Sequence, residues 1–189
     1  MAQYFYEEKN DIWVTTWNKL YNLSFLREFH IHFLEHVYHE DIVMHAMLAL
    51  NTRSFTLTSQ TTYLYNCKRE DSITNMEQGY TLKHLNDLTI VFSEIRRLIQ
   101  ADNNLSKHLQ KEINLYYLFE IYHRYLPAMY SNIKRVDLIK GLARLSQNCL
   151  PPILETRLTF KSIKRFLFLK LPFNIQYLIK SHKYKKSRA

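Results

Sequence analysis

The stretch T-L-K-H-L-N-D-L-T-I-V-F-S-E-I-R-R-L-I-Q, residues 81–100, gives the clearest secondary-structure signal in the chain. Its apolar residues recur every three or four positions, which is the spacing of one face of an α-helix. The preceding Thr74-x-x-Glu77 has the pattern of a capping box at a helix N-terminus. We therefore predict an amphipathic helix with an apolar face formed by Leu82, Leu85, Leu88, Phe92, Ile95 and Ile99.

Two further helices are predicted downstream of this stretch. A helix over residues 109–126 should end before Pro127, because proline disrupts a helix interior. The next helix covers residues 132–149 and is closed by Pro151-Pro152. The apolar stripes of residues 82–99 and 109–126 are typical of a packed core rather than of a ligand site.

Upstream of residues 81–100 the pattern changes twice. Residues 40–50 have helical spacing, and Glu40 and Asp41 in the first turn suit the positive end of the helix dipole. Residues 53–67 alternate apolar side chains with Thr, Ser and Asn, which predicts two β-strands. The alternating residues are Phe55, Leu57, Tyr63, Tyr65 and Cys67.

Charge is distributed unevenly along the chain. The 189 residues include 26 Lys+Arg and 17 Asp+Glu, which gives a net charge of +9. The last acidic residue is Glu155, and the first 156 residues carry 16 basic against 17 acidic side chains. The basic character therefore belongs to the C-terminal segment, and the overall charge does not favour a nucleic-acid-binding body.

Composition also limits the class of protein. Only 2 Gly exclude a Gly-rich phosphate loop, and 2 Cys exclude a disulfide framework or a four-thiolate metal site. The first residues lack the apolar region of a signal peptide, and the sequence has no run of ~18 uncharged apolar residues. We expect the body of the protein to be cytosolic.

A series of short motifs lies between residues 13 and 76. Trp17-Asn18-Lys19-Leu20-Tyr21 is followed by Phe25-Leu26, by Glu40-Asp41 at the start of a predicted helix, by Tyr63-x-Tyr65, and by Arg69-x-x-Ser72-Ile73-Thr74. The order and spacing of these motifs resemble the C-terminal half of bacterial family-2 glycosyltransferases, which have the GT-A fold.

The resemblance assigns roles to individual residues. Asp41 matches the carboxylate that acts as general base in inverting members of the family, and Glu40 matches its companion. Arg69 and Ser72 match a loop near the diphosphate of the donor, and arginine suits phosphate because its planar fork binds two oxygens. Trp17 and Lys19 match a segment that borders the donor site. Without the resemblance, an acidic pair at a helix start and a surface arginine would have no special meaning.

The resemblance also implies a fold and a domain organisation. We expect an α/β protein, a helix-dominated partial GT-A fold with a small sheet remnant and appended C-terminal helices. Residues 1–76 would form the C-terminal part of the GT-A domain, residues 77–152 a helical extension, and residues 153–189 a basic amphipathic tail. The family's nucleotide-binding half has no counterpart here, and a D-x-D metal motif does not occur.

These expectations describe one part of a truncated or split enzyme. The complete enzyme would transfer a hexose-type sugar from a nucleotide sugar to a glycan or lipid-linked acceptor in bacterial surface polysaccharide synthesis. Its divalent cation, Mg²⁺ or Mn²⁺, would be held by the missing N-terminal half, so activity of the isolated chain stays open. The alternative function is a non-catalytic helical module that binds membrane or nucleic acid through its basic tail.

The basic tail has its own predicted partner. Lys161, Lys164 and Arg165 can share one face of a helix, Lys170 follows them, and Pro172 interrupts the pattern. A basic amphipathic helix is typical of a membrane-surface element. We expect these four cations to contact an anionic membrane, with the protein peripheral at the inner face of the cytoplasmic membrane. No recognised nucleic-acid motif accompanies the charge.

A cluster of histidines suggests a metal site as a third interpretation. His32-x-x-Glu35-His36 matches the H-x-x-E-H motif of one class of zinc peptidase, in which two His bind zinc and Glu is the base. Such short matches arise by chance in a chain with 9 His. The motif also requires a helix, and this stretch is predicted to be partly extended. Surface or half-buried imidazoles are the favoured interpretation.

Overall fold

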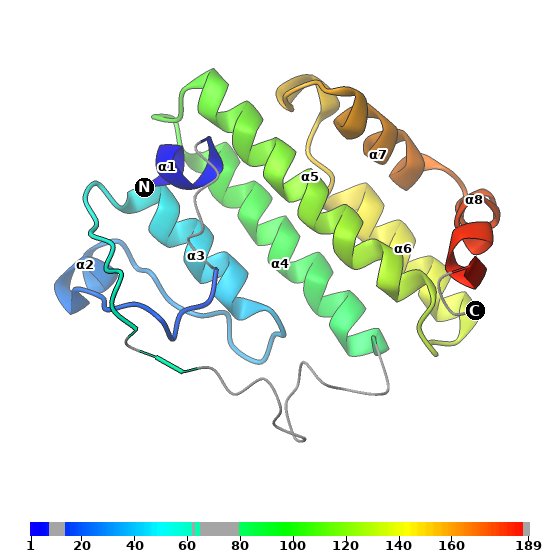
Figure 1. Cartoon of the computed structure of the whole chain (residues 1–189), viewed down its shortest axis with the longest axis horizontal. Coiled ribbons are helices and arrows are strands. Elements are labelled where there is room, and N and C mark those ends of the chain that lie inside the picture. Colours follow the sequence, from blue (N-terminus) through cyan, green and yellow to red (C-terminus); the bar gives the residue numbers. More distant parts are fainter. Residues whose placement is uncertain (8–13, 62, 65–79, 187–189) are drawn as a thin grey trace.

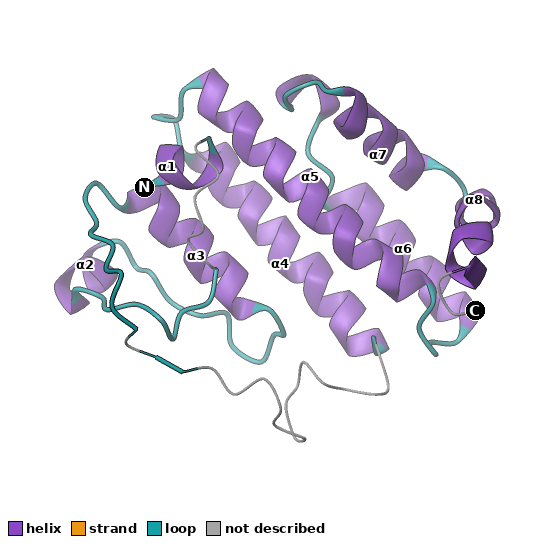
Figure 2. Cartoon of the chain, viewed as in Figure 1, coloured by secondary structure: helices purple, strands orange, loops and turns teal. Residues whose placement is uncertain are grey.

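The computed structural model describes residues 1–7, 14–61, 63–64 and 80–186. Figure 1 and Figure 2 show helices joined by loops, and the described residues include no β-strand. The elements are α1 (Ala2–Tyr6), α2 (Leu23–Glu28), α3 (Glu40–Asn51), α4 (Leu82–Ala101), α5 (Lys107–Met129), α6 (Arg135–Asn148), the 3₁₀ turn η2 (Ile153–Glu155), α7 (Phe160–Lys170) and α8 (Phe173–Lys186).

The long helices α4 and α5 lie side by side at the centre of the molecule (Figure 1). Helix α4 also packs against α3 and α6, whereas α5 packs against α1, α6 and α7. The core between these helices is apolar, and its largest completely buried side chains include Leu88, Phe92, Leu118 and Ile121. The apolar periodicity of residues 82–99 therefore correctly predicted the helix around which the fold is organised.

Helix α4 begins later than its predicted cap. The predicted capping box, Thr74-x-x-Glu77, lies outside the described residues. Instead, the Thr81 hydroxyl accepts a hydrogen bond from the His84 backbone N–H, and the His84 ring accepts one from the Thr81 N–H. A histidine thus takes the place that Glu or Gln usually has in a capping box.

Helix α5 continues past Pro127, which the sequence predicted as its end. The helix ends at Met129, with Pro127 in the last turn. Proline lacks the N–H that would bond four residues back, so its position has an intrinsic cost. Tyr125, Ala128 and Met129 around it are buried in the core, and this tertiary packing offsets the local preference.

The contact between α4 and α6 depends on small groups. Gly141 on α6 packs directly against Leu85 on α4, so closely that a Cβ atom at residue 141 would lie 2.4 Å from Leu85 Cδ2. At the end of α6 the buried Cys149 thiol donates to the Thr89 carbonyl at 3.3 Å and lies 3.5 Å from the Ser93 hydroxyl. Burial raises the pKa of this thiol.

The C-terminal helices pack on the far side of α5 from α3 (Figure 1). Helix α7 is capped by Thr159 and Ser162, and Pro172 separates it from α8 as predicted. The buried Gln176 of α8 accepts a hydrogen bond from the Tyr125 hydroxyl at 2.6 Å and donates one to the Phe168 carbonyl at 2.8 Å. One amide side chain therefore joins α5, α7 and α8.

The expected α/β fold class, a partial GT-A fold with a sheet remnant, is wrong for the described part of the chain. Residues 53–61 and 63–64, where two strands were predicted, have no regular structure, and their side chains are exposed. A strand needs a neighbouring strand to pair its N–H and C=O groups. No such neighbour exists among the described residues, so the alternating pattern has no sheet to join.

The sequence predicts no membrane-spanning helix. None of the helices in the ranges given above is both long enough and apolar enough to cross a bilayer.

Candidate functional site

The N-terminus of α3 is held in place by α4. The Tyr38 backbone N–H donates to the Asp87 carboxylate at 3.0 Å, and the Tyr38 ring stacks on His84 with centroids 4.0 Å apart. Lys83 bridges this carboxylate and the His36 carbonyl. His39, the N-cap residue of α3, has a φ of 66°, in the left-handed region that His30 and His36 also adopt and that residues with a side chain seldom occupy. Glu40 and Asp41 are therefore presented from a fixed turn.

Asp41 is half-buried at this helix N-terminus. Burial is the main reason that its pKa is raised, and the neighbouring charge of Glu40 raises the pKa further. The backbone N–H groups of Ile42 and Asp41 and the Arg124 guanidinium partly offset these effects. A carboxylate with a raised pKa is a better proton acceptor than an exposed one, which suits a general base.

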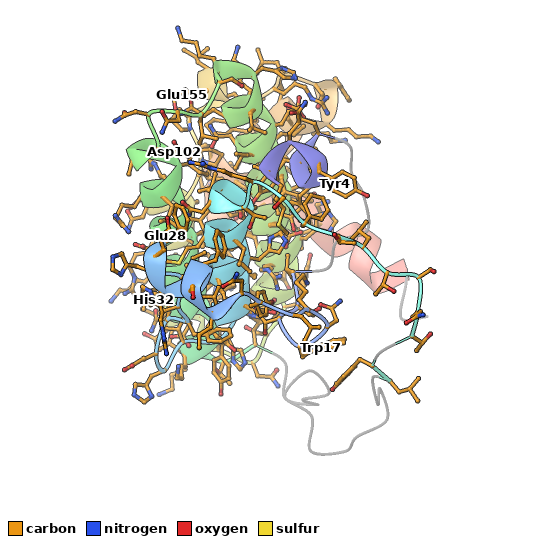
Figure 3. The ribbon with its side chains drawn as sticks, turned by 90° about the vertical axis from the view of Figure 1, so that its left-hand side faces the viewer. Tyr4, Trp17, Glu28, His32, Asp102 and Glu155 are labelled. Atoms are coloured by element: carbon orange, nitrogen blue, oxygen red, sulfur yellow. The ribbon has the colours of Figure 1, made fainter. Side chains whose placement is uncertain are left out.

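The W-N-K-L-Y motif supplies a cation near Asp41. The Lys19 ammonium donates hydrogen bonds to the Thr15 carbonyl and, at 2.8 Å, to the Asn18 side chain. Burial lowers the pKa of Lys19, and the charge of Asp41 counteracts that effect. The motif also lies against residues 63–64, because the Trp17 ring contacts the Tyr63 ring with centroids 4.4 Å apart. Trp17 lies at the edge of the described structure (Figure 3).

Helix α5 supplies residues that the sequence analysis missed. Tyr116, Glu120 and Arg124 are spaced four residues apart and so lie on one face of the helix. Arg124 Nη2 lies 3.2 Å from Glu120 Oε2, while its buried Nε has no hydrogen-bond partner in the part of the chain described. Burial is the main reason that the pKa of Tyr116 is raised, with smaller effects of Glu120 and Asp41. This polar spacing inside an apolar helix was the signal available in the sequence.

Two histidines complete the cluster. His39 and His45 are buried enough that the pKa of each is lowered to about 4, so both rings are neutral at pH 7. The nearby charge of Arg124 also lowers the pKa of His39, and that of Lys19 lowers the pKa of His45. Neither Nε2 atom has a hydrogen-bond partner within the described ranges. Such buried polar atoms are costly unless they serve a ligand or water.

We call Lys19, His39, Asp41, His45 and Arg124 the Asp41 cluster. Its members interact electrostatically in pairs. Lys19 interacts with His45 and Asp41, and Arg124 interacts with Asp41 and His39. The cluster brings together a loop, the N-terminus of α3 and the face of α5. It combines one carboxylate of raised pKa with fixed cations and neutral imidazoles, an arrangement able to take up a proton and to hold a polar or anionic group.

The other predicted site residues are distributed differently. Glu40 lies next to Asp41 on α3, whereas Arg69 and Ser72 lie outside the described residues. Lys161, Lys164, Arg165 and Lys170 all lie on α7. Arg165 points inward, with its guanidinium carbon 3.8 Å from the centroid of the Phe119 ring on α5.

The histidine motif does not form a helix. His32 and His36 lie in an irregular loop, and both side chains are exposed. His32 Nδ1 lies 2.6 Å from the His30 carbonyl oxygen. Within the described ranges no group of three or more His, Cys, Asp or Glu side chains is arranged to hold a metal ion. Figure 3 labels His32 and Trp17 well apart, so this loop and the W-N-K-L-Y motif form different edges of the molecule.

Comparisons with protein-family models, with curated proteins and with solved structures found no match to this chain.

Proposed function

We propose that the chain forms the acceptor side of a glycosyltransferase of the kind that its motifs resemble, with Asp41 as the general base. One observation carries the proposal. The Asp41 carboxylate is half-buried with a raised pKa, and it interacts with Lys19 of the W-N-K-L-Y motif although 22 residues separate them. This electrostatic interaction between two of the motifs supports the proposal.

The proposed chemistry is an inverting transfer. An Asp41 oxygen takes the proton of an acceptor hydroxyl as the hydroxyl oxygen attacks the anomeric carbon of the donor sugar. The bond between that carbon and the nucleoside diphosphate breaks, and the diphosphate leaves with the bonding electrons. In this proposal a divalent cation, Mg²⁺ or Mn²⁺, belongs to a separate donor half and would neutralise the departing charge. Arg69 and Ser72 remain proposed contacts of the diphosphate.

The rest of the Asp41 cluster supports this role. The cations of Lys19 and Arg124 favour the ionised form of the carboxylate, against the effects of burial and Glu40. These cations therefore offset part of the rise in the Asp41 pKa that burial and Glu40 cause.

The test is a reconstituted transfer assay. The chain is combined with the donor half of a related bacterial transferase, and release of nucleoside diphosphate from nucleotide sugars is measured with glycan and lipid-linked acceptors. Removal of a general base typically costs about 10²–10⁴-fold in rate, so Asp41→Asn should reduce turnover by that factor. Asp137→Asn is the matched control, because Asp137 is also an aspartate in the first turn of a helix.

Two results would contradict the proposal. The first is an active wild-type mixture in which Asp41→Asn and Asp137→Asn turn over equally fast. The second is a mixture that binds both substrates without any transfer, which would favour the non-catalytic module as the alternative function.

A further inference from the structure

Helix α7 turns an apolar face away from the protein. Phe160 is 83% exposed and Leu167 is 59% exposed, and Ile163 and Leu171 are exposed as well. These residues are spaced three or four positions apart, so they lie along one face of the helix and its C-terminal end. We call these four residues the outward face. A surface helix normally buries its apolar stripe, so an outward apolar face indicates a second binding partner.

The opposite face of α7 accounts for the packing of the helix on the body. Ser162 and Leu169 are almost completely buried, and Arg165 stacks on Phe119 of α5. Helix α8 shows the same division, because Gln176 is buried and Lys180 lies 5.4 Å from the ring centroids of Tyr122 and Phe168. Both helices are therefore already anchored, and their outward apolar residues are not needed to hold them in place.

The charges around the outward face have one sign. Lys161 and Lys164 are exposed on α7 beside Phe160 and Leu167, and the sequence contains no acidic residue after Glu155. Helix α8 continues the pattern with the exposed apolar residues Ile175 and Ile179. Figure 1 shows the two helices together at one end of the molecule, away from α2 and α3.

We propose that the outward face binds the surface of a lipid bilayer that contains anionic lipids. The apolar side chains enter the boundary between head groups and acyl chains, while Lys161 and Lys164 contact the lipid phosphates. A second copy of the chain fits less well, because two outward faces would bring lysines of like charge together. Nucleic acid would pair with the lysines but would leave Phe160 and Leu167 in water.

The experiment is flotation of the full chain with two kinds of vesicle. One kind consists of phosphatidylcholine, and the other contains added phosphatidylglycerol. We expect the chain to float with the anionic vesicles and to partition weakly into the neutral ones. Each lysine near an anionic surface contributes about 1 kcal/mol, which is about fivefold in partitioning. Lys161→Gln/Lys164→Gln should therefore weaken binding by about 25-fold at low salt.

The apolar contribution has its own variants. Phe160→Ser/Leu167→Ser should abolish flotation at moderate salt, where the electrostatic attraction is screened. The matched control is Leu23→Ser/Ile90→Ser, which removes two exposed apolar side chains from α2 and α4. Lys107→Gln/Lys140→Gln is the control for charge, because both side chains are exposed on other helices. Melting temperatures of all four variants show whether each still folds.

Leu167→Trp gives an independent measurement. Its difference fluorescence should shift to shorter wavelength with anionic vesicles and be quenched by brominated acyl chains, whereas Leu23→Trp should show neither change. Asp41→Asn should bind vesicles like the wild type, so failure of the transferase proposal would not affect this result.

Three results would overturn the proposal. A wild-type chain that stays unbound with anionic vesicles at low salt excludes the membrane. A wild-type dimer that Phe160→Ser/Leu167→Ser converts to a monomer shows that a second copy covers the face. Duplex DNA that binds more tightly than the vesicles, with no effect of the apolar variants, assigns the lysines to nucleic acid.

Discussion

Replacement of Gly141 by alanine should destabilise the protein, although alanine is the better helix former. An added Cβ atom would lie 2.4 Å from Leu85 Cδ2 and 3.0 Å from Leu85 Cγ, whereas carbon atoms in good contact are about 3.5–4.0 Å apart. Leu85 is 0% exposed and so has no free space to move into. Helix α6 would have to move away from α4, or Leu85 would have to leave its rotamer.

The size of the effect is the difference of two opposing contributions. The change from Gly to Ala inside a helix stabilises by about 1 kcal/mol. Overpacking of a well-filled core costs about 1–3 kcal/mol. We expect a net loss of about 1 kcal/mol, which corresponds to a Tm decrease of about 2–4 °C for a chain of this size.

The assay is urea unfolding followed by circular dichroism, with a double-mutant cycle that includes Leu85→Ala. Leu85→Ala alone should cost about 2–5 kcal/mol, and less in the Gly141→Ala background because the truncated side chain relieves the clash. Lys140→Gly is the control that shows how strongly α6 responds to helix propensity. If Gly141→Ala raised the free energy of unfolding by about 1 kcal/mol, with no coupling to Leu85, the close packing of α4 and α6 would be refuted.

Two further predictions concern the Asp41 cluster and pH. Because burial and Glu40 raise the pKa of Asp41 in the folded state, ionised Asp41 opposes folding, and its cost appears as pH rises through the folded pKa. Asp41→Asn should unfold at higher urea concentration than the wild type at pH 7, with a smaller difference near pH 4; a constant difference would contradict this account. The pKa of His39 and that of His45 are each lowered from 6.5 to about 4, so both residues make the wild type less stable as pH decreases through this range, and His45 alone should account for a loss of up to about 3 kcal/mol. In urea titrations at pH 7 and pH 5, His45→Leu should remove most of the loss that His45 causes, whereas substitution of the exposed His123 by Leu should leave the loss unchanged. Equal pH profiles for the two variants would refute the assignment of this loss to His45.

The helices were predictable because their signals are local. Apolar spacing located α3, α4 and α6 to within a few residues of their observed bounds. The errors arose where tertiary contacts or missing partners decide the outcome. Pro127 remains helical because its neighbours are buried in the core. The alternating residues 53–61 and 63–64 form no strand because no second strand lies beside them in the described structure.

The Asp41 cluster was only half predictable for the same reason. Asp41 and Lys19 were chosen from the order of motifs, and they interact in the structure. Arg124 lies more than 80 residues downstream, and its electrostatic effect on Asp41 depends on the packing of the whole fold. Arg165 was predicted to contact a membrane, but its side chain stacks on Phe119. The spacing of charges on α7 does not show which of its cations turns inward.

Chemical modification of the Cys149 thiol can report local opening of the structure. It is sealed between α4 and α6 by contacts with Thr89 and Ser93, and a thiol of raised pKa reacts slowly even when it is reached. A maleimide reagent can therefore modify it only during excursions in which α6 lifts away. In a Cys67→Ser background, the rate of maleimide modification would therefore measure how often this opening occurs, and no label has to be introduced.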